Sequence, residues 1–293
     1  MTLFTQLAFN GVSTGCSLAI IAMSFGLIYK TTGTFHVAHS IVFISSAYLA
    51  YFLFQSIHWP VYIIVPLCAI WAALLGMGIY YFLYKPIYKQ GGSVLVVFIT
   101  SLAVTIIGEN LLSLIFNPDP KQIPQGVLTN PLQIGGFVFS YLDIIAILCA
   151  LLVFGIIVFY LNRTPSGRLI KAVASDPELA ICKGINTEKV YLTTYAIGSA
   201  LAMPAGILIG LRSTITPGMG SSINLIAVMA VIFGGIGNVR GALFAALILS
   251  LIRNISLIFL DASWLSTLTY GIFLIVIMIW PTGLFGEKQN TRS

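Results

Sequence analysis

Charged side chains are scarce in this chain of 293 residues, and that scarcity is the first constraint on its class. Asp, Glu, Lys and Arg make up 8% of the residues, 58% are hydrophobic, and the mean hydropathy is +1.01. A soluble domain has about 25% charged residues, so an ordinary soluble fold is excluded. Apolar runs of 17 to 25 residues recur, and each is long enough to cross about 30 Å of hydrocarbon. The composition predicts an integral membrane protein.

The sequence signatures of several enzyme classes are also missing. There is no G-x-x-x-x-G-K-[ST] P-loop, no G-x-S-x-G and no H-E-x-x-H, so we expect neither ATP hydrolysis nor hydrolase chemistry on this chain. The four cysteines are far apart and lie mostly in apolar runs, which predicts packing rather than disulfides or metal binding. We therefore expect a chain that is not an enzyme and has no cofactor of its own.

The N-terminal residues lack the features of a removable signal peptide. No basic region precedes the first hydrophobic run, and no small-residue cleavage pattern follows it. We therefore expect the first span to be retained.

The apolar runs predict an all-α fold, a polytopic bundle of about eight or nine transmembrane helices in one transmembrane domain covering residues 1–293. We expect spans at about 9–29, 35–57, 60–84, 93–116, 141–162, 190–211, 223–238, 241–260 and 264–281. The run at 223–238 is short and ends in glycines, which indicates a broken or re-entrant segment. The polar loop at 117–140 is rich in Pro, Gly and Asn and predicts a structured turn region.

The basic residues predict the orientation of the chain. Nine spans place the two termini on opposite sides, and an external N-terminus leaves eleven bases on the inner side against two, Lys121 and Arg212, on the outer side. Because bases are retained on the cytoplasmic side, we expect the N-terminus outside and the C-terminus in the cytoplasm. The formal charge of +6 is explained by these flanking bases, so nucleic acid is not an expected partner, whereas membrane lipid is.

The longest polar interruption runs from residue 163 to residue 189 and holds eight of the 22 charged residues. Asp176 followed by Pro177 and Glu178, with Gly184 as the stop, has the order of a short capped helix. Ser166 is expected to cap a second short helix with Leu169, Ile170 and Val173 on one face. By pattern alone, this cytoplasmic loop is either a connector lying on lipid headgroups or a docking element for a partner.

Small residues recur every four positions in three spans and predict close helix packing. They are Gly11, Gly15 and Ala19; Gly198, Ala202, Gly206 and Gly210; and Gly237, Gly241 and Ala245.

Polar residues inside or next to spans are the candidates for a solute pathway, because ionisable groups at membrane depth are costly. Glu109 and Arg253 are the two clear charges inside spans. We rank a structural pair between them first, a solute pathway second and a proton relay at Glu109 third. His36 and His39, three apart, are expected on one helical face at a span entrance, and without a third ligand they do not predict a metal site. The expected pathway residues are His36, His39, Glu109, Asn110, Gly234, Gly235 and Gly237.

These motifs together resemble the permease subunits of ABC importers for branched-chain amino acids, specifically the shorter of the two permease types, along essentially the full chain. The matching residues are Phe9-Asn10-Gly11-Val12, Gly15, Ala38-His39, Gly167-Arg168, Ala172, Ala174, Asp176, Ala180, Gly184-Ile185-Asn186-Thr187, Ala205-Gly206, Phe233-Gly234-Gly235-Ile236-Gly237, Gly241-Ala242 and Pro281-Thr282-Gly283-Leu284-Phe285-Gly286.

The resemblance implies a second, homologous permease subunit, two cytoplasmic ATPase subunits that bind the ATP, and an external solute-binding protein, all at a bacterial inner membrane. It also implies that the cytoplasmic loop docks on the ATPases as a coupling element. The coupling residues expected here are Gly167, Arg168, Asp176, Glu178 and Gly184.

One motif departs from the family pattern. The family reads N-F-A-H-G followed by an acid, whereas this chain reads His36-Val37-Ala38-His39-Ser40-Ile41. The expected function is therefore the permease of an ABC importer, forming half of the pathway for branched-chain amino acids or a related small polar solute, with urea or a short amide as the alternative cargo. The alternative function is an ion-coupled secondary transporter that uses Glu109.

Overall fold

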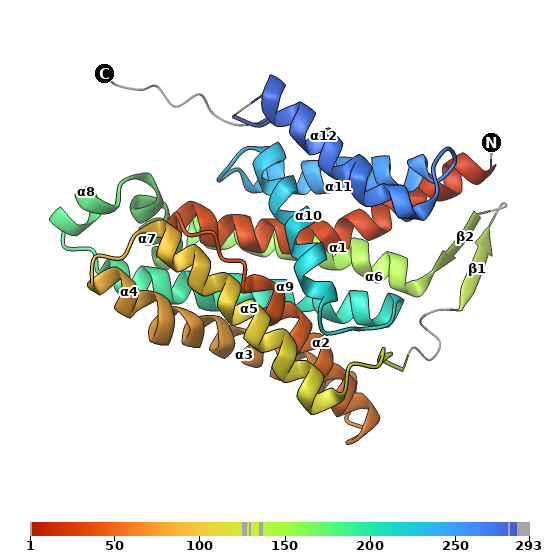
Figure 1. Ribbon diagram of the computed structural model, residues 1–293, viewed down its shortest axis with the longest axis horizontal. Coiled ribbons are helices and arrows are strands. Elements are labelled where there is room, and N and C mark those ends of the chain that lie inside the picture. Colours follow the sequence, from red (N-terminus) through yellow and green to blue (C-terminus); the bar gives the residue numbers. More distant parts are fainter. Residues whose placement is uncertain (1, 125–127, 129, 135–136, 281, 286–293) are drawn as a thin grey trace.

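The protein is a helical bundle with one small β-hairpin at one end (Figure 1). The computed structural model describes residues 2–124, 128, 130–134, 137–280 and 282–285. Within them, seven helices are long and apolar enough to cross a membrane. The expectation of a polytopic all-α membrane protein is confirmed. The hairpin, β1 (Pro131–Ile134) paired antiparallel with β2 (Phe137–Ser140), lies in the expected external loop, where only turns were predicted.

All nine apolar segments expected from the sequence contain helix. The seven long ones are α1 (Thr2–Thr32), α3 (Val61–Ile79) continuing through the π-helix η1 (Tyr80–Tyr84) into α4 (Lys85–Lys89), α5 (Val94–Phe116), α6 (Tyr141–Arg163), α9 (Thr187–Arg212), α11 (Val239–Ser256), and the short η3 (Ala262–Trp264) continuing into α12 (Leu265–Ile279). The other two are shorter: α2 (His39–Gln55) and α10 (Met219–Gly234). The segment expected at 35–57 therefore starts later as a helix, and the one expected at 223–238 begins and ends earlier.

Helix α1 is the centre of the bundle, because it packs against α6, α9, α10 and α11. It has no single polar face, as expected of a helix enclosed by others, and its residues from Ala19 to Met23 are fully buried. A Cβ atom added at Gly11 would lie 3.0 Å from the Leu251 Cα atom of α11. The predicted small-residue groove on this helix therefore faces α11 and brings the two backbones together.

Helix α9 uses its small residues in the same way against α1 and α2. A Cβ atom added at Gly206 would lie 2.1 Å from the carbonyl oxygen of Phe43, and one at Gly198 would lie 2.6 Å from the Ile28 side chain. Each site excludes a larger residue, so the repeat predicted from the sequence sets the distance between these helices.

The two ends of the bundle are different in character (Figure 1). At one end, the start of α1 meets the hairpin, where the Gln6 amide nitrogen donates to the Val138 carbonyl at 2.5 Å. Figure 1 shows the amphipathic connector α7 (Pro165–Ser175) and α8 (Pro177–Cys182) at the opposite end. The chain beyond α12 reaches that second end, where the Leu284 amide donates to the Phe233 carbonyl at 2.7 Å. Thr2 and Phe285, the first and last described residues, thus lie at opposite ends.

A partly buried ion pair joins three helices near the hairpin. Arg212 Nη2 of α9 lies 2.8 Å from Asp143 Oδ1 of α6 and donates to the Ser13 hydroxyl of α1 at 2.6 Å. The Asp143 carboxylate also accepts hydrogen bonds from Ser13 and from the Ser140 backbone and hydroxyl. The structural pair expected between Glu109 and Arg253 is wrong, because Glu109 accepts a hydrogen bond from Ser221 instead.

We expect Asp143→Asn to destabilise the protein by about 2 kcal/mol, since it leaves the Arg212 charge without its counter-ion. This is below the ~3–5 kcal/mol typical of breaking a fully buried pair, because the Arg212 side chain is 28% exposed. Thermal unfolding in detergent measures the effect. Glu188→Gln is the matched control, since it breaks the more exposed pair of Glu188 with Lys85 and should shift the unfolding temperature less. Equal shifts in the two variants would contradict a special role for the three-helix contact.

Candidate functional site

The chain is not helical between α1 and α2, and this interruption lies deep in the bundle. We call residues 33–38 the broken segment. It begins at Gly33, whose φ of +65° suits glycine. It ends at Ala38, just before His39, the first residue of α2. His39 contacts Ser24 of α1, which lies eight residues, or about 12 Å, before the end of that helix. The chain therefore turns back into the bundle before α2 starts, which accounts for the short length of α2.

Side chains from several helices hold the broken segment in place. Backbone groups without helical partners are tolerated at membrane depth only where protein or water satisfies them. The Ser101 hydroxyl of α5 accepts from the Ala38 amide at 2.8 Å, and the Asn224 amide of α10 donates to the Val37 carbonyl at 3.3 Å. Tyr88 of α4 is hydrogen-bonded to the hydroxyl of Thr34. The segment is a junction at which α1, α4, α5 and α10 meet.

His36 and His39 lie together at this junction, with ring centroids 5.7 Å apart and no exposed surface. They do not share a helical face as expected, because His36 precedes α2. His36 Nδ1 lies 2.9 Å from the Tyr84 hydroxyl, and His39 Nε2 lies 3.0 Å from the Ser24 hydroxyl. Within the described part of the chain, the second nitrogen of each ring has no hydrogen-bond partner. Since buried polar atoms normally have partners, this pair is a candidate polar site.

The π-helix η1 is the feature that brings tyrosines to the histidine pair, and no pattern in the sequence predicts it. Tyr84 lies in η1 and reaches His36, while Tyr80 stacks on Tyr195 of α9 with ring centroids 5.1 Å apart. Tyr195 in turn lies 5.0 Å from the His36 ring. π-Helical turns often occur at functional sites, so η1 supports the importance of this cluster.

Glu109 and Asn110, the other predicted polar pathway residues, do not join the histidines. Glu109 Oε1 accepts from the Ser221 hydroxyl at the start of α10. The exposed Asn110 side chain donates to the Ile106 carbonyl of its own helix at 2.7 Å. The structure therefore does not bring the predicted pathway residues into one cluster.

The glycines between α10 and α11 form a compact turn at the α8 end of the bundle. A Cβ atom added at Gly234 would lie 2.3 Å from the Gly241 backbone, and Gly235 and Gly237 have φ of +91° and +85°. The Lys30 side chain donates to the Gly237 carbonyl at 2.8 Å. Close packing at Gly234 and positive φ at Gly235 and Gly237 explain why glycine occupies these positions. Pro281 and Gly286 of the C-terminal motif, and Lys288 and Arg292, lie outside the described residues.

The expected coupling residues form the connector of α7 and α8. Asp176 caps α8, as predicted, by accepting from the Leu179 amide at 2.9 Å, and Gly184 has a φ of +79° just beyond its end. Gly167 packs against α6, where a Cβ atom would lie 2.0 Å from the Tyr160 carbonyl oxygen. Arg168 and Glu178 are exposed.

Two details of the connector differ from the prediction. Thr164, not Ser166, caps α7, because its hydroxyl accepts from the Gly167 amide at 2.9 Å and Pro165 takes the first helical position. Leu169 is exposed, whereas Ile170 and Val173 are buried in a cluster with Leu27 of α1 and Val190 of α9.

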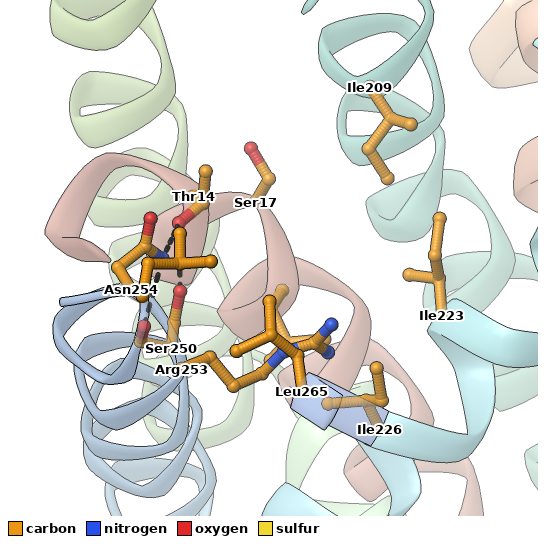
Figure 2. A pocket seen from close by; sticks show the side chains of 11 residues that line it. Thr14, Ser17, Ile209, Ile223, Ile226, Ser250, Arg253, Asn254 and Leu265 are labelled. Carbon is orange, nitrogen blue, oxygen red and sulfur yellow. Dashed lines mark hydrogen bonds between the residues drawn. The ribbon is translucent and has the colours of Figure 1, made fainter. Parts of the chain in front are cut away.

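A pocket of about 270 Å³ opens between α1, α9, α10, α11 and α12 (Figure 2). We call it the Arg253 pocket. Its polar lining residues are Thr14, Ser17, Ser250, Arg253 and Asn254. The sequence singled out Arg253 but not the pocket. The signal that could have found it is the spacing of three or four between polar residues on two apolar helices, which places them on one face of each.

Comparison with known proteins agrees with this architecture. Residues 7–279 match the family model described as the permease component of the branched-chain amino acid transport system. The chain is 26% identical to the high-affinity branched-chain amino acid transport system permease protein BraD of Pseudomonas aeruginosa, over 98% of this chain and 97% of BraD. It is 25% identical to LivH of Escherichia coli, described in the same words, over 98% and 96%.

A more distant likeness extends to sugar permeases. The chain is 26% identical to the ribose import permease protein RbsC of Haemophilus influenzae, over 92% of this chain and 83% of RbsC. The match to the family model covers nearly the whole chain, including every described helix that could cross a membrane. The chain therefore belongs to the branched-chain amino acid transport permease family and is a multi-pass permease subunit of an ABC importer.

Proposed function

We propose that this chain forms half of a translocation pathway and that a second, homologous permease subunit forms the other half. Two cytoplasmic ATPase subunits, which bind the ATP, and an external solute-binding protein complete the importer in a bacterial inner membrane. The observation that carries this proposal is the α7–α8 connector, which offers a docking surface at one end of a bundle that has no P-loop of its own.

The connector is suited to contact another protein. Leu179 and Ile181 of α8 are 53% and 58% exposed, beside the exposed charges of Glu178 and Lys183. Apolar side chains within a polar rim are typical of interaction surfaces. A lipid-facing connector would instead keep its apolar residues on one membrane-facing side, whereas Ala180 of the same helix is buried against the bundle.

Helices α7 and α8 are packed directly against α1 and α9 of the bundle. Ala180 of α8 and Ile170 and Val173 of α7 form one buried cluster with Leu27 of α1 and Val190 of α9. Because α1 leads into the broken segment, a rigid-body shift of α8 reaches the junction at His36 and His39 through packed side chains.

The distribution of charge supports a cytoplasmic position for this connector. Lys85 and Lys89 pair with Glu188 at the start of α9, and Lys30 reaches the turn at Gly237, so these bases lie at the α8 end. At the hairpin end, Lys121 pairs through its backbone with Ile215. Bases accumulate on the cytoplasmic side, so the proposed orientation places the N-terminus and the hairpin outside.

Branched-chain amino acids are the proposed cargo, because the relatives matched over nearly the whole chain carry that description. Urea or a short amide is the alternative cargo, favoured by the altered motif from His36 to Ile41, which forms part of the buried junction. The ion-coupled transporter that uses Glu109 is set aside, because the chain belongs to the permease family and Glu109 is hydrogen-bonded to Ser221.

We expect Asp176→Lys to reduce the solute-stimulated ATPase activity of the assembled complex about tenfold. The change removes the cap of α8, worth ~1 kcal/mol, and places a cation at a helix N-terminus, which the helix dipole disfavours. Asp261→Lys is the matched control, since Asp261 is also exposed and precedes a helix but makes no capping hydrogen bond. Normal stimulated activity in Asp176→Lys would exclude the coupling role.

The exposed thiol of Cys182 on α8 tests both docking and orientation. In a protein with the other three cysteines replaced by alanine, a membrane-impermeant maleimide should label Cys182 in inside-out vesicles and not in right-side-out vesicles. Bound ATPase subunits should slow the reaction, because α8 would then be covered. Labelling from the outside would reverse the orientation, and equal rates with and without ATPases would contradict docking at α8.

A further inference from the structure

The Arg253 pocket contains a cation for which the described residues supply no carboxylate, and Tyr270 of α12 is its electrostatic neighbour. The three ion pairs among the described residues use Lys85, Lys89 and Arg212, and Arg253 forms neither an ion pair nor a hydrogen bond within the described part of the chain. Arg253 lies in the last turn of α11 and is partly buried, and burying a charge is costly unless an anion or water meets it. Its planar guanidinium is suited to bind a carboxylate with two hydrogen bonds.

The polar neighbours of Arg253 form hydrogen bonds with one another and not with Arg253. Asn254 donates from its side-chain nitrogen to the Thr14 hydroxyl at 3.1 Å and to the Ser250 carbonyl at 2.9 Å. The Thr14 and Ser250 hydroxyls lie 2.8 Å apart. Figure 2 shows this network on the α1 and α11 side of the pocket, while Arg253 extends away from it towards Ile226 and Leu265. The network fixes α11 against α1 and leaves the guanidinium available.

The rest of the pocket is apolar. Its other lining residues are Leu18, Ile209, Ile223, Ile226, Leu257 and Leu265. A pocket of about 270 Å³ is slightly smaller than the ~300–1,000 Å³ typical of drug-sized ligands. The apolar lining suits an aliphatic group, and the Arg253 cation suits a carboxylate. A small solute that carries both groups is therefore complementary to this pocket.

We propose that the Arg253 pocket binds the transported solute, with the carboxylate at Arg253 and the aliphatic part against α9, α10 and α12. The inference rests on the proposed function, because it takes the solute to pass along this chain. The aliphatic amino acid is the cargo already proposed above, and the pocket gives it a binding site on this chain. Urea and neutral amides have no anionic group for Arg253, so the pocket selects against them.

The position of the pocket links it to the broken segment. Ile223 and Ile226 of α10 line the pocket, and Asn224 between them donates to the Val37 carbonyl. Thr14 and Ser17 belong to the half of α1 nearer the hairpin, which is the external half in the proposed orientation. A solute arriving from outside would therefore contact α10, the helix that also holds the broken segment.

Charge-selective labelling tests whether a free cation faces the pocket. In the reconstituted complex, with the four native cysteines of this chain replaced by alanine, Ile226→Cys is treated with anionic sulfonatoethyl or cationic trimethylammonioethyl methanethiosulfonate in phosphatidylcholine vesicles. We expect the anionic reagent to react faster, and Arg253→Gln to lower the anionic-to-cationic rate ratio roughly tenfold, as expected for one charge a few ångströms away. Arg253→Lys should retain most of the preference.

The matched control is Arg240→Gln, which removes an exposed arginine from the other end of α11 and should leave the ratio unchanged. A ratio that Arg253→Gln does not alter, or a thiol that neither reagent reaches, overturns the proposal.

Protection by added solutes tests the carboxylate. Millimolar leucine should slow the labelling of Ile226→Cys, whereas leucinamide and urea should not. Equal protection by leucinamide overturns the assignment of the carboxylate to Arg253. If phosphatidylglycerol in the vesicles protects the thiol and leucine adds nothing, the anionic group is a lipid headgroup, and the solute site is also overturned.

Uptake separates this inference from the proposed function. A wild-type complex that imports no solute with its binding protein and ATP contradicts the proposed function. A wild-type complex that imports leucine, with Arg253→Gln giving the same KM, contradicts the pocket alone. We expect Arg253→Gln to raise KM at least tenfold, since charge-assisted hydrogen bonds are the strong ones, and Arg253→Lys to restore part of the loss.

Discussion

Backbone polar groups at membrane depth need partners from protein or water, and in the broken segment the protein supplies several of them. The peptide groups between α1 and α2 are outside any helix, so Ser101 and Asn224 are brought in from α5 and α10 to bond them. The side chains of the segment are bonded in the same way, with Tyr84 of η1 at His36. The arrangement of the surrounding helices follows from these contacts, since each must approach the same short stretch of chain.

Features with local causes could be predicted from the sequence. The apolar segments, the Asp176 cap, the stop at Gly184 and the small-residue grooves all follow from neighbouring residues or from a helical repeat. The grooves are informative because a small residue lets another helix approach closely, whichever helix that is. The helices could therefore be predicted, and for α1 and α9 the packing faces as well.

Pairings between distant helices could not be predicted. Asp143 and Arg212 are 69 positions apart, and nothing near either residue identifies the other. The expected contact between Glu109 and Arg253 was wrong for the same reason, since two charges inside spans can face different neighbours. The histidines were placed on one face because a continuous helix was assumed, and the π-helix that supplies Tyr84 had no signal in the sequence.

The contact between Gly234 and Gly241 has a mechanical consequence. The turn places backbone against backbone, and the Phe233 carbonyl and the Asn238 side chain are hydrogen-bonded to Leu284 and Phe285. Sliding α10 along α11 would break these hydrogen bonds and separate the two glycines, so the turn resists that displacement. The same two helices line the Arg253 pocket, and the contact at the turn therefore helps to fix the spacing of two of its walls.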